Sequence, residues 1–165
     1  MTTPQRMLIL TGLFLIAFTM AFGVWYAVFD EHQTLVGMGV QMATGFAEMA
    51  AGEPGASSEA LENYAALSQE YRREVHAHGH WGMLSLVLII IGLAFNRLAL
   101  SERHGLLLAW LLALSATLFP LGVLMQIGPA AGLGKLLTVP ASLGMVVGLL
   151  VSAWALIRNP QRAAD

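Results

Sequence analysis

Three histidines stand at alternate positions directly before a long apolar run, in the sequence E-V-H-A-H-G-H-W-G-M at residues 74–83. Imidazole nitrogens bind zinc, copper, nickel and iron, and they also serve as axial ligands of haem iron. Three imidazoles with an open coordination position suffice to hold a catalytic metal ion. Because polar side chains at the start of an apolar helix are costly unless they are solvated, paired or liganded, His76, His78 and His80 are the first candidate site.

Helical spacing separates these histidines into two sets. At 100° per residue, His76 and His80 share one face and can clasp a single ion, whereas His78 projects roughly opposite. His32 is as far before Pro54 as His76 is after it. A chain that folds back at Pro54 would bring these two to the same depth, which predicts that His32, His76 and His80 bind one metal ion or haem iron.

The apolar stripes of the flanking segments favour another phase. They place His78 and Glu31 at the seam between the two arms and turn His76 and His80 aside. The sequence leaves both arrangements open, because a small error in helical phase accumulates over several turns. The candidate cofactor ligands are therefore His32, His76, His78 and His80, and the candidate metal ligands are His32, His76, His80 and Glu31.

Haem b or copper is the expected cofactor. The chain has no cysteine, which excludes thiolate metal sites, iron–sulfur clusters and disulfides. Thioethers suit copper(I), although the helical spacing of Met38, Met42 and Met49 is explained better by packing. The alternative is that the histidines are solvated, bind no cofactor and only anchor the helix at the membrane surface. His104, beside Glu102 and Arg103, is expected to be solvated.

The composition is that of a polytopic membrane protein. Of 165 residues, 57% are apolar and 11% are charged, and the mean hydropathy is +0.69. The net charge of −2 argues against a nucleic-acid partner, which would require a basic surface. A helix needs about 20 apolar residues to cross a bilayer. The expected spans are residues 7–29, 80–96, 105–127 and 136–157.

Residues 31–75 are predicted to form a helical hairpin outside the bilayer. Apolar residues recur at helical spacing in both halves, with a Gly-Pro-Ser turn at residues 52–58 between them. Ser57 or Ser58 is expected to cap the second half, and three glycines are expected to kink the first. The stripes are Leu35, Met38, Met42, Phe46 and Met49, then Leu61, Tyr64, Leu67, Ser68, Tyr71 and Val75; the glycines are Gly37, Gly39 and Gly45.

These elements predict an all-α fold, a single membrane domain over residues 1–165. Four transmembrane helices form two antiparallel hairpins, the first of which extends outside the bilayer. Gly144, Gly148 and Ser152 form a ridge of small residues for close helix packing. Tryptophans are expected in belts at the interfaces, with Trp25 and Trp81 at the outer one and Trp110 and Trp154 nearer the inner one.

The placement of basic residues predicts the orientation. Five of the eight lie on the side of the termini, namely Arg6, Arg97, Arg103, Arg158 and Arg162. Because basic residues favour the cytoplasmic side, both termini are expected in the cytoplasm and the hairpin outside. The predicted location is a bacterial inner (cytoplasmic) membrane, crossed several times.

The stretch His76-Ala77-His78, followed by Gly82 and an apolar helix, resembles the H-x-H stretches of haem-copper oxidase subunit one and its small membrane relatives. The resemblance covers about ten residues and implies haem b or copper ligation by His76 or His78 in respiratory electron flow. That subunit has about twelve helices with histidines on several of them, whereas the last two spans expected here carry none within the membrane.

Two functions follow from these observations. The first is a haem- or metal-binding membrane protein in electron transfer, oxidation or metal handling, with a membrane or periplasmic redox partner. The alternative is a non-catalytic small subunit or assembly factor whose hairpin docks a partner. Whether it is an enzyme, and whether it forms a homo-oligomer, the sequence leaves open.

Overall fold

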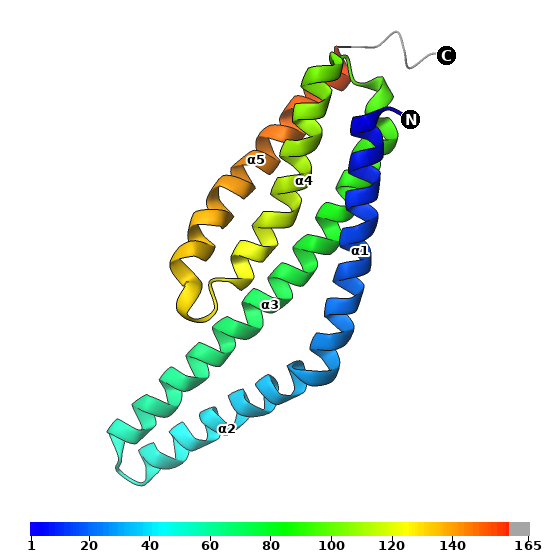
Figure 1. The fold of residues 1–165 in the computed structure, drawn as a ribbon. Helices are drawn as coiled ribbons and strands as arrows, with labels where there is room; N and C mark the ends of the chain where they lie inside the picture. The colour runs from blue at the N-terminus through cyan, green and yellow to red at the C-terminus, as the bar shows by residue number, and fades with distance from the viewer. Residues whose placement is uncertain (159–165) are drawn as a thin grey trace.

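The fold is entirely helical over residues 1–158, the part of the chain that the computed structural model describes. Five α-helices and two 3₁₀ turns follow one another, and this range contains no strand (Figure 1). The predicted all-α class is confirmed. The elements are α1 (Thr3–Phe29), α2 (Glu31–Ala50), α3 (Pro54–Ala94), η1 (Phe95–Arg97), α4 (Glu102–Leu124), η2 (Gly128–Ala130) and α5 (Ala131–Ile157).

Four of these helices, α1, α3, α4 and α5, are long and apolar enough to cross a membrane, as expected. Many of their large apolar side chains point away from the protein, among them Phe14, Leu93 and Leu150. A monomer in water rarely exposes so much apolar surface, whereas a bilayer covers it. The start of α1, the turn between α3 and α4 and the end of α5 lie at one end of the bundle (Figure 1).

The first helix pair extends well past the second. At 1.5 Å per residue, α3 with its 41 residues is about 60 Å long, roughly twice the hydrocarbon thickness of a bilayer. Figure 1 shows the outer half of α3 and all of α2 lying beyond the turn that joins α4 to α5. The predicted projecting hairpin is therefore present, and residues 80–96 stay the predicted membrane-crossing part of α3.

The arm that precedes the hairpin breaks at Asp30 and not at its glycines. Asp30 leaves the helical conformation, with φ −122° and ψ −49°, and it separates α1 from α2. The helix α2 then runs without interruption through Gly37, Gly39 and Gly45. The expected kink at these glycines is not a break in the helix: Gly37 and Gly45 lie against the Leu67 and Leu61 side chains of α3, whereas a Cβ atom on Gly39 would meet nothing within 4 Å.

The seam between α2 and α3 uses small residues. Thr34 and Gly45 are the buried residues of α2, and a Cβ atom on Gly45 would lie 3.3 Å from the Leu61 side chain. The predicted apolar stripe is rotated away from this seam, and Phe46 is 69% exposed. Because α2 turns its small residues toward α3, most of its large apolar side chains remain exposed. They are Leu35, Val36, Val40, Met42, Phe46 and Met49.

Ser57 does not cap α3 as expected. The helix begins at Pro54, and the buried Ser57 hydroxyl donates a 2.8 Å hydrogen bond across the seam to the carbonyl oxygen of Gly45. Proline is well suited to the first helical position because it lacks the N–H group that would have no partner there. Ser57 therefore joins the two arms near the tip of the hairpin.

The second hairpin, α4 with α5, is held together by the predicted ridge of small residues. A Cβ atom on Gly148 would lie 2.5 Å from Cδ2 of Leu112, and one on Gly144 would lie 2.5 Å from the Ser115 hydroxyl oxygen. Further out, the two backbones themselves come close: a Cβ atom on Gly122 would lie 2.8 Å from the Thr138 nitrogen, and one on Gly134 would lie 2.7 Å from the Gly122 carbonyl oxygen. The packing role predicted for Gly144 and Gly148 is confirmed.

Candidate functional site

The three clustered histidines lie on two different faces of α3. His78 points into the seam with α1, where its ring lies 6.2 Å from that of Phe22 and against Gly23. His76 and His80 point to another face, with their ring centroids 5.7 Å apart. The His80 ring also meets Phe119 of α4 edge to face, with a centroid separation of 4.8 Å. The structure thus resolves the two phases that the sequence left open by placing only His78 in the seam.

The spacing of the His76 and His80 rings suits a shared ion. A bond from metal to imidazole nitrogen is about 2 Å long, and the nitrogen lies about 1 Å from the ring centre, so two rings on one ion have centroids about 5 to 6 Å apart. The observed 5.7 Å lies in this range. The two rings are therefore spaced as two ligands of one ion would be.

The backbone orients the ring of His76. Its Nδ1 atom lies 3.1 Å from the carbonyl oxygen of Arg72, one turn earlier on α3. A carbonyl only accepts hydrogen bonds, so Nδ1 must carry the proton and donate. The Nε2 atom then keeps its lone pair, which is the arrangement found in most metal-binding histidines.

An open groove surrounds the pair. It has a volume of about 330 Å³ and is lined by Val75, His76, Gly79, His80 and Met83. A Cβ atom on Gly79 would meet nothing within 4 Å, so the space between the two histidines is clear. Nearby, Arg73 donates a hydrogen bond to the carbonyl oxygen of Gln126, which ties α3 to the end of α4. The groove therefore lies on the side of α3 that faces the second hairpin.

The seam on the other side of α3 buries three polar atoms that have no hydrogen-bond partner among residues 1–158: Tyr26 Oη, Glu74 Oε2 and His78 Nδ1. Glu74, in the part of α3 that precedes the membrane-crossing segment, is only 8% exposed. Burial, reinforced by the carboxylates of Asp30 and Glu70, raises its pKa to about 7. Glu74 and His78 are four residues apart and so share a face, a signal by which the sequence could have found this pair.

The remaining predicted ligands lie elsewhere. His32 is exposed on the first turn of α2, beside the half-buried Glu31. Over the described part of the chain, no three histidine or carboxylate side chains come together in a group that could hold a metal ion. His32 and His76 would lie at the same depth only if the chain before Pro54 were one straight helix. The break at Asp30 divides it into two helices. His32 therefore does not join His76 and His80 in such a group.

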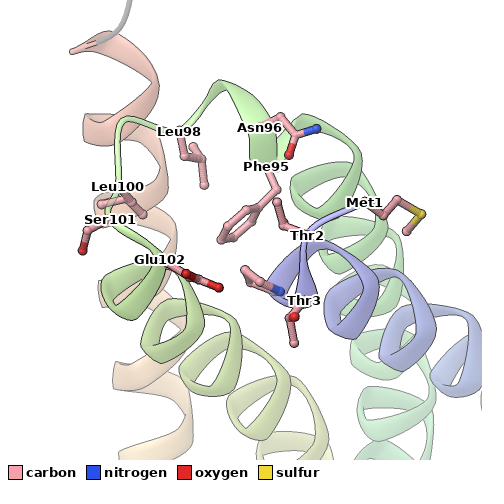
Figure 2. Close-up of a pocket in the computed structure, with 11 residues that line it drawn as sticks. Met1, Thr2, Thr3, Phe95, Asn96, Leu98, Leu100, Ser101 and Glu102 are labelled. Atoms are coloured by element: carbon pink, nitrogen blue, oxygen red, sulfur yellow. The ribbon is translucent and has the colours of Figure 1, made fainter.

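Another hollow lies at the opposite end of the bundle from His76, His78 and His80. Its volume is about 610 Å³, and it is enclosed by the start of α1, by η1 and by the start of α4 (Figure 2). Phe95 and Leu98 point into the same space as Thr2 and Thr3, and Glu102 is the one carboxylate among its lining residues. With no histidine in its lining, this cavity offers none of the chemistry of the groove.

No protein-family model, curated protein or solved structure matches the chain. The resemblance to haem-copper oxidase subunit one therefore stays a prediction that rests on His76-Ala77-His78. Its two histidines face opposite sides of α3, because residues two positions apart are about 200° apart around a helix axis.

Proposed function

We propose that this helical membrane protein binds a metal ion through His76 and His80. The observation that carries the proposal is the pair of rings at 5.7 Å, one of them oriented by the Arg72 carbonyl so that its Nε2 atom is free. Of the two cofactors expected from the sequence, a metal ion suits this pair better than haem, because the groove is shallow and holds about 330 Å³.

The small number of ligands indicates the kind of metal chemistry. Structural metal sites in proteins are closed by four protein ligands, whereas sites that exchange a ligand keep open positions. Two imidazoles in an open groove would hold an ion that can still be reached by another molecule. This supports metal handling, the acquisition or transfer of an ion, over a structural role.

The orientation of the protein belongs to the same proposal. Arg6, Arg97, Arg103 and Arg158 lie at the end of the bundle that carries the start of α1 and the end of α5. Arg162 lies outside the described residues. Because basic residues favour the cytoplasmic side, this end would face the cytoplasm and the groove would lie at the outer surface of a bacterial inner membrane.

Metal content of single variants tests the site. Wild-type protein in detergent should bind one ion per chain. His76→Ala and His80→Ala should each weaken binding at least 10- to 100-fold, because the loss of a residue that only hydrogen-bonds to a metal ligand already has an effect of that size. His104→Ala is the matched control, because His104 is exposed and contacts Ser101 at the other end of the bundle. Competition with a chromophoric chelator measures the affinity. Unchanged binding by either groove variant would overturn the proposal.

A second function is favoured by one observation, the uncovered apolar face of α2 outside the membrane. Leu35, Phe46 and Met49 lie on this face, where water would otherwise meet them. Residues 30–75 carry eight carboxylates and two arginines. The hairpin therefore suits a partner protein with an apolar patch rimmed by basic side chains, and not an anionic lipid surface.

A photo-crosslinking residue tests this docking surface. Placed at Phe46 in native membranes, it should capture a second protein, and the yield should fall as ionic strength rises because salt screens the rim charges. Asn63, exposed on α3, is the control position and should capture nothing. The absence of a product at Phe46, or a product with the mass of two copies of this chain, would contradict docking of a distinct partner.

A further inference from the structure

The groove contains one more side chain that can bind a metal ion, the thioether of Met83. Met83 is 56% exposed and lies three residues after His80 and seven after His76, so all three share one side of α3. Long side chains on a helix lean toward its N-terminus. Met83 lines the groove together with both histidines, and a Cβ atom on Gly79 would meet nothing within 4 Å, so the Met83 thioether has room to turn toward His80.

The set of two imidazoles and one thioether selects among metal ions. Thioethers are soft ligands that suit copper(I), whereas magnesium, calcium and manganese require oxygen ligands. A structural zinc site would need further thiolate, imidazole or carboxylate ligands. The nearest buried carboxylate, Glu74, lies in the seam with α1, and the described residues bring no third histidine or carboxylate to the pair.

The charge around the groove also favours a monovalent ion. Arg73 lies three residues before His76, and its guanidinium is fixed on this side of α3 by the carbonyl oxygen of Gln126. A fixed positive charge repels a divalent cation twice as strongly as a monovalent one at the same distance. Both the ligand softness and the local charge therefore point in the same direction.

We propose that the groove is a copper(I) site formed by His76, His80 and Met83. This inference rests on the proposed function and adds the identity of the ion and the third ligand. The site has three protein ligands and an open side, so it is suited to receive copper from one carrier and release it to another. No change of oxidation state is part of the proposal.

The experiment compares two ions in four proteins. Wild type, Met83→Leu, His76→Ala and Met20→Leu are purified in detergent, and copper(I) affinity is measured anaerobically against a chromophoric copper(I) chelator. Zinc affinity is measured separately in the same proteins. Met20→Leu is the matched control, because Met20 is exposed on α1 and does not line the groove. Leucine has nearly the volume of methionine, and circular dichroism verifies that each variant is folded.

We expect Met83→Leu to weaken copper(I) binding about 10-fold or more and to leave the weaker zinc binding unchanged, because only the soft ligand is lost. His76→Ala should weaken both ions, and X-ray absorption should show a copper–sulfur contact in wild type that is missing from Met83→Leu. Wild-type copper(I) affinity in Met83→Leu, or tighter binding of zinc than of copper(I) by wild type, would overturn the copper site while leaving the histidine pair in place. Undiminished binding by His76→Ala would overturn both proposals.

Discussion

Replacing Gly134 with alanine should separate the outer ends of α4 and α5 and destabilise the protein by about 3 kcal/mol, at the upper end of the usual cost of overpacking. An added Cβ atom would lie 2.7 Å from the carbonyl oxygen of Gly122 and 2.8 Å from the backbone nitrogen of Gln126. Backbone atoms cannot rotate aside as a flexible side chain does. The helices themselves would have to move, and the Gln126 Nε2 hydrogen bond to Thr138 Oγ1 at 3.0 Å would be lost with them.

Thermal unfolding in detergent, followed by circular dichroism, measures this effect. Gly132→Ala is the matched control, because it lies in the same first turn of α5 and a Cβ atom there would meet nothing within 4 Å. Alanine in a helix is favoured over glycine by up to about 1 kcal/mol, so the control should melt at or above the wild-type temperature. Equal melting temperatures for the two variants would refute the close backbone contact.

Replacing Trp81 with alanine should lower the free energy of unfolding by about 3 to 5 kcal/mol, the usual range for a buried aromatic residue. Trp81 is 3% exposed and packs between three helices. Its ring meets Phe18 of α1 edge to face at 4.9 Å, and its Nε1 atom donates to the carbonyl oxygen of Thr117 on α4 at 3.4 Å. The variant would leave a cavity at the point where both hairpins meet.

Trp110→Ala serves as the comparison for Trp81→Ala. Trp110 is 51% exposed on α4, so its removal leaves no internal cavity and should lower the melting temperature much less. The two variants are measured by the same thermal unfolding in detergent. A loss of stability in Trp110→Ala as large as in Trp81→Ala would show that Trp81 acts only as an anchor in the interface.

The helices and their pairing could be predicted because the sequence patterns that specify them extend over many residues. Apolar runs of about 20 residues and a Gly-Pro-Ser turn specify four candidate spans and a hairpin with little ambiguity. The face that α2 turns toward α3 could not be predicted in this way. Periodicity assigns the large apolar side chains to the interior, whereas the contact uses Thr34 and Gly45, which the pattern does not single out.

The candidate site could be predicted in part for a similar reason. The i, i+4 spacing already joins His76 to His80, and this relation survives in the structure because it depends on one helix alone. The predicted grouping of His32 with this pair depends on the geometry of two helices and a turn. The break at Asp30 changes that geometry. Trp81 was assigned to the outer interface from its type, but its burial depends on Phe18 and Thr117, which lie on other helices.

Because α3 is one uninterrupted helix over Pro54–Ala94, a movement of one end is transmitted to the other. The histidine pair lies near its middle, about 33 Å from Pro54 at 1.5 Å per residue, and no proline or turn interrupts the hydrogen-bonded backbone on either side. The other arm is divided at Asp30, where the backbone leaves the helical conformation. A partner that pulls the tip sideways would tilt α3 as one body against α4 and change the space between His80 and Phe119. Mechanical work done outside the membrane would in this way reach the groove without passing through any flexible joint.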